Sequence, residues 1–186
     1  MSTHSVLVVA ATAGELAAPA GWRTLVCGVG PVEAASTTAR ALALDPPAAI
    51  LHVGIAGART LPPLTCVIGT ASHYVDLTVS ESFAPHALTP SMPLVDALRE
   101  ALPNAIGCPI GTSARVGGTS DHAVEAMEGF AVLRAAQHAG IPAAEVRIIS
   151  NAIDEPDRTK WHIRDACAEV ISLTPRLVDI IAACVR

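Results

Sequence analysis

Short, almost uninterrupted apolar runs recur along the chain, and most are followed by a turn and a helix-forming segment. The runs at 5–11, 48–53 and 143–149 contain few polar residues. Consecutive apolar positions over this length are typical of strands buried on both faces of a sheet. Their alternation with helical segments predicts an α/β domain with three layers, in which helices flank a central, largely parallel mixed sheet.

The remaining segments complete this alternation. We expect further strands at 22–29, 66–75 and 110–116, with antiparallel pairs around 66–78. We expect helices at 32–44, 94–102, 123–139, 161–172 and 175–185. In the last of these, Thr174 would be the N-cap and Pro175 the first helical residue.

Composition narrows the class of protein. A chain of 186 residues is expected to form one domain, 1–186. With 51% hydrophobic and 16% charged residues, it does not have the composition of a disordered chain. A net charge of −5 without a basic block argues against a nucleic-acid polymer as partner, but not against a free nucleoside.

The cysteines and the amino-terminal apolar run indicate the cellular compartment in which the protein is expected. The five cysteines are scattered and form no Cys-x-x-Cys pair, so neither a zinc site nor a disulfide framework is expected. This pattern fits a reducing, cytoplasmic compartment. The run at 6–11 has no positive charge before it and Glu15 soon after it, so we expect a strand and not a signal peptide. No run approaches the ~20 apolar residues that span a bilayer.

Two glycine-rich segments follow predicted strands. The segment 28–31 lacks the third glycine of a dinucleotide fingerprint, and a tight turn explains it. In the segment 54–58, small residues would let backbone N–H groups approach a ligand oxygen. A close backbone crossing in the core explains the same residues, and both interpretations stay open.

Charged residues supply the candidate chemistry. Glu15 follows the first strand, where a carboxylate can take a proton from water, or can be an exposed acid in the first turn of a helix. Glu125 and Glu128, three apart, would share a helix face. They are either solvated acids or, for Glu128 beside Met127, a carboxylate able to accept ribose hydroxyls. Arg147 lies in an apolar strand and needs a partner, either an ion pair or a substrate.

The order of these motifs resembles the purine nucleosidases of the nucleoside phosphorylase superfamily along almost the whole chain. The motifs are Ala-Thr-Ala-Gly-Glu, Cys-Gly-Val-Gly-Pro, Val-Gly-Ile-Ala-Gly, Gly-Thr-Ser-Asp, Met-Glu-Gly and Arg-Ile-Ile-Ser-Asn. The Ser-Asn ending and the charged loop up to Trp161 are most similar to the futalosine hydrolase family, which acts in an alternative menaquinone pathway. The resemblance implies a small-molecule nucleoside substrate, no metal or organic cofactor, and a homodimer.

The resemblance also implies roles for single residues. Glu15 falls where the nucleosidases keep the carboxylate that activates water. Met127 falls where the family packs against the ribose, and Glu128 where it binds the ribose hydroxyls. Arg147 falls at the arginine of the strand that leads to the catalytic loop. Trp161 falls where relatives place an aromatic residue over the base pocket, although a core tryptophan is the alternative.

Asn151 falls where the adenine-specific nucleosidases keep an aspartate. An aspartic acid can protonate N7 of a departing adenine, whereas an amide has no titratable proton. The amide carbonyl can accept from N7–H, and its NH₂ can donate to a 6-oxo group. Asn151 therefore favours hypoxanthine or guanine as the leaving group.

The resemblance leaves hydrolysis and phosphorolysis to be distinguished. The loop 12–15 carries Glu15 and no phosphate-binding arginine, which favours water as nucleophile. The expected reaction is hydrolysis of the N-glycosidic bond of a 6-oxopurine nucleoside, futalosine, to hypoxanthine and dehypoxanthine futalosine. A phosphate-dependent purine nucleoside phosphorylase and a non-catalytic nucleoside-binding domain are the alternatives.

Two features depart from the family pattern. The connection 119–125, which normally borders the base, is compressed. Ile55 stands where adenine-specific relatives carry a hydroxyl residue, and it is expected, with Gly54, to contact the substrate. Both departures allow an altered or weakened activity.

Overall fold

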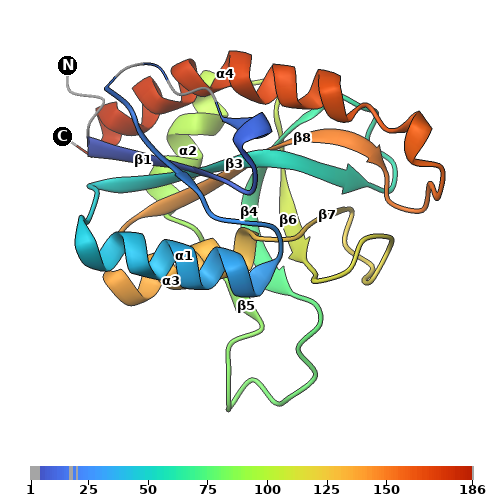
Figure 1. Ribbon diagram of the computed structural model, residues 1–186, viewed down its shortest axis with the longest axis horizontal. Coiled ribbons are helices and arrows are strands. Elements are labelled where there is room, and N and C mark those ends of the chain that lie inside the picture. The colour runs from blue at the N-terminus through green and yellow to red at the C-terminus, as the bar shows by residue number, and fades with distance from the viewer. Residues whose placement is uncertain (1–4, 17–18, 20, 186) are drawn as a thin grey trace.

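The computed structural model describes residues 5–16, 19 and 21–185. Within them, one eight-stranded sheet lies between two layers of helices (Figure 1). The strands are β1 (Val6–Ala10), β2 (Arg23–Val26), β3 (Ala49–Ala58), β4 (Cys66–Tyr74), β5 (Ala87–Leu88), β6 (Ile106–Thr112), β7 (Val124–Ala126) and β8 (Ala143–Ala152). The helices are α1 (Pro31–Leu44), α2 (Met92–Ala101), α3 (Gly129–Ala139) and α4 (Ile163–Cys184), with short 3₁₀ helices η2 (Ala13–Glu15) and η3 (Arg158–Lys160).

The central strands are buried on both faces, as their apolar runs predict. Helices α1 and α3 cover one face of the sheet, and α4 with α2 covers the other (Figure 1). In β3, Ile50 packs under α1 and α3, while Leu51 and Val53 pack under α2 and α4. Successive side chains of a strand serve opposite layers, so an uninterrupted apolar run fills both cores.

Part of the sheet closes on itself. Strand β3 pairs with both β7 and β8, β8 pairs with β4, β4 with β6, and β6 with β7, which makes a ring of five strands. Val67, Ile110, Val124 and Ile149 form a small core belonging to these strands. The β4–β5 and β4–β8 pairs are antiparallel, which confirms the expectation for this region, and β3–β7 is antiparallel as well. The predicted mixed α/β architecture is therefore confirmed.

The predicted helix 123–139 is wrong in its first third. Val124 to Ala126 form strand β7, and α3 begins only at Gly129. Tertiary contacts explain the difference, because Val124 and Ala126 are buried in the small core and β7 pairs with β3 and β6. Glu125 and Glu128 therefore do not share a helix face. Glu128 is instead the N-cap residue of α3.

The two predicted closing helices are one helix. Helix α4 runs through Pro175, which has no N–H to donate to the turn before it. Thr174 is not an N-cap, since its hydroxyl donates to the Val170 carbonyl oxygen (2.6 Å). Val170 and Leu177 both pack against the sheet in the same core, so burial along the whole length keeps the helix continuous.

Several boundaries differ from the prediction. Strands β3 and β8 extend to Ala58 and Ala152, so the segment 54–58 and Asn151 belong to strands. Strand β6 lies earlier than the predicted strand 110–116, and β2 is shorter than 22–29. Among the described helices, none combines the length and apolarity needed to cross a membrane.

Candidate active site

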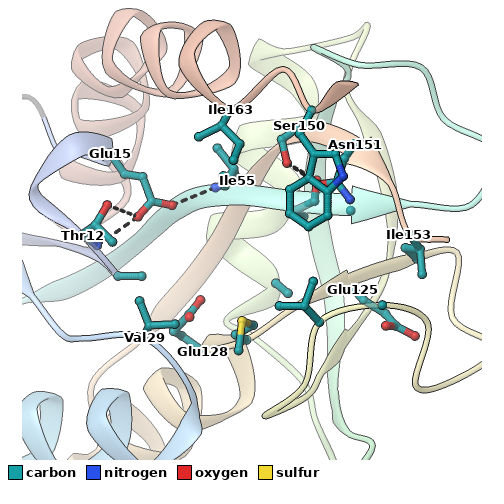
Figure 2. A pocket seen from close by; sticks show the side chains of 18 of the residues that line it. Thr12, Glu15, Val29, Ile55, Glu125, Glu128, Ser150, Asn151, Ile153 and Ile163 are labelled. Carbon is teal, nitrogen blue, oxygen red and sulfur yellow. Dashed lines mark hydrogen bonds between the residues drawn. The ribbon is translucent and has the colours of Figure 1, made fainter. Parts of the chain in front are cut away.

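A cavity of about 270 Å³ opens at the carboxyl ends of the parallel strands β1, β3 and β8 (Figure 2). This is where α/β sheets place ligands. Six of the eight predicted site residues line it: Glu15, Ile55, Met127, Glu128, Asn151 and Trp161. Gly54 and Arg147 are not part of its lining and lie behind it.

Glu15 is held rigidly at one end of the cavity. It ends η2, and only 4% of its surface is exposed, so the interpretation as an exposed acid is wrong. Its Oε2 accepts from the backbone N–H (2.9 Å) and hydroxyl (2.8 Å) of Thr12. Its Oε1 accepts from the backbone N–H of Ile55 (3.1 Å). Figure 2 shows the carboxylate of Glu15 between Thr12 on one side and Ile55 of β3 on the other.

Gly54 makes room for this arrangement. A Cβ at Gly54 would collide with Nη1 of Arg147 and lie 2.8 Å from Oε1 of Glu15. The sequence predicts that small residues here let a backbone N–H approach an oxygen. The structure shows such an approach, with the N–H of Ile55 and the oxygen of Glu15. Substrate contact by Gly54 and Ile55 stays a prediction.

Glu128 lies at the junction of β7 and α3, below the cavity in Figure 2. Its Oε1 accepts from the backbone N–H of Gly30 (3.1 Å), and its Oε2 lies 3.5 Å from Nη1 of Arg147. Burial raises the pKa of Glu128, while Arg147 and the Gly30 hydrogen bond act in the opposite direction. The carboxylate is thus fixed but costly to keep ionised.

Arg147 is fully buried and is paired as the sequence requires. Its Nε donates to Oε1 of Glu145 (2.8 Å), and Nη1 faces Glu128. Burial alone would lower the pKa of Arg147, but Glu145 and Glu128 raise it overall, so the guanidinium stays charged. Contact of Arg147 with substrate stays a prediction. Sequence reasoning missed Glu145, although a Glu-x-Arg pair in an apolar strand places both side chains on one face.

Asn151 has its amide oriented by neighbours. The Ser150 hydroxyl donates to Oδ1 (2.7 Å), and Nδ2 donates to the Ala152 carbonyl oxygen (2.8 Å). A reversed amide would set Oδ1 against that carbonyl, so the network selects this orientation. One N–H and one lone pair of the amide are left over for a ligand in the cavity. Ser150 is a site residue that sequence reasoning did not single out.

Trp161 forms part of the cavity wall and is not a core tryptophan. It is half-buried, and its Nε1 donates to the Glu155 carbonyl oxygen (3.0 Å). The Arg158 guanidinium lies 5.5 Å from the centre of its ring. The indole is therefore fixed by the polar loop before α4, with one face available to the cavity.

Glu125 has a role that the sequence did not indicate. It lies on β7 and lines the cavity, and it is buried. Its carboxylate accepts from the backbone N–H of Thr119 (3.1 Å) and from the backbone N–H (2.8 Å) and hydroxyl (2.7 Å) of Ser120. It is therefore not a solvated acid, and its hydrogen bonds hold Thr119 and Ser120, at the start of the connection 119–125, beside β7.

Comparison with known proteins decides the family. Residues 112–185 match the model of the phosphorylase superfamily. The chain is 34% identical to futalosine hydrolase of Streptomyces coelicolor, in a match that covers 88% of this chain and 81% of that protein. The chain belongs to the futalosine hydrolase family. The resemblance inferred from the motifs is therefore confirmed.

Solved structures show the same fold. Futalosine hydrolase of Helicobacter pylori matches with a TM-score of 0.82 at 16% identity, covering 94% of this chain and 97% of that one. The 5'-methylthioadenosine/S-adenosylhomocysteine nucleosidase of the same organism matches with a TM-score of 0.83 at 15% identity, covering 96% and 99%. This chain therefore shares the fold of these two enzymes over nearly its whole length.

Proposed function

We propose that this protein hydrolyses the N-glycosidic bond of a 6-oxopurine nucleoside, namely futalosine, to hypoxanthine and dehypoxanthine futalosine in menaquinone biosynthesis. One observation carries the proposal: the buried carboxylates of Glu15 and Glu128 line the same cavity as the oriented amide of Asn151. The identity with the Streptomyces coelicolor futalosine hydrolase supports the choice of substrate.

Bond cleavage runs ahead of water attack, and positive charge develops on the ribose, as in other glycoside hydrolyses. Glu15 orients and deprotonates the water. Its carboxylate suits this role because three hydrogen-bond donors fix its plane, while Oε1, which accepts only from Ile55, keeps a lone pair for the water. A fixed base of this kind needs little reorganisation when the water attacks.

Glu128 accepts hydrogen bonds from the ribose hydroxyls and stabilises the positive sugar. The position of Glu128 favours this role, because the Gly30 N–H and the Arg147 guanidinium contact its two carboxylate oxygens and so fix its orientation. Met127, next to it on the cavity wall, packs against the ribose. A buried carboxylate interacts strongly with charge that develops beside it.

Asn151 stabilises the departing purine. Because Ser150 and Ala152 fix the amide, its free N–H and lone pair are oriented before the substrate binds. They match the N7 and 6-oxo edge of hypoxanthine, as the comparison with the aspartate of adenine-specific enzymes implies. Trp161 covers the base.

The charge of the cavity favours water over phosphate. Three carboxylates line it, those of Glu15, Glu125 and Glu128, and Arg115 is the one cationic side chain among its described lining residues. A phosphate anion beside Glu15 would meet repulsion without a compensating arginine pair. The nucleoside phosphorylase alternative would need such a pair.

The expected cytoplasmic location and homodimeric state belong to the same proposal. Large apolar side chains that do not line the cavity are exposed, including Phe83 (85%) and Leu44 (75%). Apolar groups of this kind are suited to contact with a second subunit. Sedimentation of the purified protein would test the oligomeric state.

The test of the proposed function is chromatography of free base from futalosine, inosine and methylthioadenosine, each with and without phosphate. Hypoxanthine from futalosine without phosphate is the expected result. Strict dependence on phosphate would make the protein a phosphorylase. No base from any substrate, with ligand-induced thermal stabilisation, would make it a nucleoside-binding protein.

A further inference from the structure

A buried network of ionisable side chains lies behind the cavity, on adjacent strands. In the parallel pairing of β3 with β8, His52 is opposite Glu145 and Gly54 is opposite Arg147. Side chains two residues apart on a strand point to the same face of the sheet, and so do the side chains of residues that are paired across neighbouring strands. These four positions therefore share the sheet face that α1 and α3 cover.

Glu145 is placed between α3 and Arg147. Only 1% of its surface is exposed, and its Oε1 receives the 2.8 Å hydrogen bond from Nε of Arg147. Its Oε2 has no hydrogen-bond partner among the described residues. Gly129, the first residue of α3, leaves the space, because a Cβ there would collide with both carboxylate oxygens. The amino-terminal end of a helix favours a negative charge at this place.

His52 holds the other side of the guanidinium. It is fully buried, and burial, together with Arg147, keeps its pKa well below the usual value, so the imidazole is neutral. Nη2 of Arg147 lies 3.1 Å from Nε2 and 3.3 Å from Nδ1 of His52. A neutral imidazole has one nitrogen that accepts a hydrogen bond from Nη2.

With Nε and Nη2 engaged, Nη1 is the guanidinium nitrogen left without a hydrogen bond among the described residues. It lies 3.5 Å from Oε2 of Glu128 and next to the Gly54 backbone, where Oε1 of Glu15 also lies. The arrangement therefore aims one charged, unsatisfied donor at both carboxylates of the proposed mechanism.

We propose that Glu145 is a positioning residue for the hydrolysis: with His52 it fixes Arg147 so that Nη1 faces Glu128 and Glu15, and its charge prevents Glu128 from pairing with Arg147 alone. This inference rests on the proposed function, since it assigns Glu145 to the same site. Glu145 is not among the residues that line the cavity, so it acts through Arg147.

Beyond the effect of burial, the negative charge of Glu145 also raises the pKa of Glu128. An ion pair that served only the stability of the fold would have no need of this effect. The groups that act on Glu128 are Arg147 and Glu145 on β8, Glu15 in η2 and the Gly30 N–H before α1. The thiol of Cys27 is also near, but burial and Glu128 raise its pKa to about 12, so it carries no charge. Removing the charge of Glu145 therefore leaves Arg147 to stabilise ionised Glu128.

The test compares the full chain with Glu145→Gln and Glu145→Asp, using futalosine hydrolysis across the acidic to neutral pH range. Glu145→Gln should lower kcat by about 10- to 100-fold with little change in KM, because Arg147 loses the carboxylate that holds its Nε and shifts towards Glu128. It should also move the acidic limb of kcat/KM to lower pH. Glu145→Asp, which keeps the charge on a shorter side chain, should lower kcat and keep the limb in place. Asp45→Asn, which removes a surface ion pair with Arg23, is the matched control and should change neither quantity.

Unchanged kcat and pH profile in Glu145→Gln, with only a lower melting temperature, would overturn the inference and leave a structural ion pair. If Glu145→Gln does not fold, normal kcat in Glu145→Asp would overturn it, and reduced kcat at constant KM would support it. No base release by the unmodified protein would overturn the proposed function and this inference together. Active unmodified protein with unaffected variants would overturn this inference alone.

Discussion

The carboxylate of Glu128 accepts a hydrogen bond of 3.1 Å from the backbone N–H of Gly30, 98 positions earlier in the chain. Gly30 is the N-cap of α1 and Glu128 is the N-cap of α3, so one side chain joins the starts of two helices. Gly30 has a φ of 89°, a conformation that favours glycine. The glycine-rich turn after β2 thus helps to orient a carboxylate of the cavity, a contact that a tight turn alone would not imply.

Replacing Glu128 with glutamine should lower kcat/KM for futalosine and change its pH dependence. Burial raises the pKa of Glu128, so acidification removes the ionised form at a higher pH than for an ordinary glutamate. Activity that needs the ionised form is present above this pKa and is lost as the pH falls through it. Glutamine does not titrate, so this limb should be absent from the variant. The same acidic limb in both proteins would show that Glu128 is not the group that titrates.

Replacing Glu15 with glutamine should remove most turnover and leave the fold intact. The amide cannot take a proton from water, and general-base catalysis typically contributes about 10²–10⁴-fold. Steady-state hypoxanthine release measures the loss, and thermal unfolding followed by circular dichroism checks the fold. Near-normal turnover would exclude Glu15 from the mechanism.

Replacing Asn151 with aspartate should shift preference towards adenine nucleosides. The acid can supply a proton to N7, whereas the native amide cannot. The ratio of kcat/KM for futalosine to that for methylthioadenosine is the quantity to measure. Ser150→Ala is a second variant, which removes the hydroxyl that bonds Oδ1 of Asn151 and the Ala56 carbonyl oxygen but adds no acid. An unchanged ratio in Asn151→Asp would contradict the leaving-group assignment.

Replacing Gly54 with alanine should reduce both stability and activity. The added methyl group would collide with Nη1 of Arg147 and approach Oε1 of Glu15, and overpacking of this kind costs about 1–3 kcal/mol. Gly107→Ala is the matched control, because its Cβ would lie 3.4 Å from its nearest neighbours, an ordinary contact. Urea unfolding and kcat should separate the two variants. Equal behaviour would show that Arg147 and Glu15 can move apart at little cost.

The sequence was informative where local pattern and tertiary structure agree. The apolar runs in β1, β3 and β8 predict strands because both of their faces are buried. The helix predicted across β7 failed because Glu125, Ala126 and Met127 favour helices, while pairing with β3 and β6 decides the structure. The break predicted at Pro175 failed because packing on the sheet outweighs one missing hydrogen bond.

Six of the residues that line the cavity could be predicted from the order of motifs, since most of them lie at or just beyond the carboxyl ends of strands. Their supporting partners could not. His52 and Glu145 look like polar interruptions in apolar strands, and nothing near them in the sequence shows that both contact Arg147. Glu125 gives no local sign that it accepts hydrogen bonds from Thr119 and Ser120. Such contacts depend on the register between strands.

The closed ring of five strands has a consequence for exchange of amide hydrogens. The floor of the cavity is built on β3, β7 and β8, whose backbone groups are paired within the ring. Amides with such pairing exchange mainly through global unfolding, whereas exposed loops open at low free energy. The wall formed by Arg115, Val116 and Gly117 is an exposed loop, and it should exchange quickly. Hydrogen exchange should therefore divide the cavity into a slowly exchanging floor and a rapidly exchanging wall.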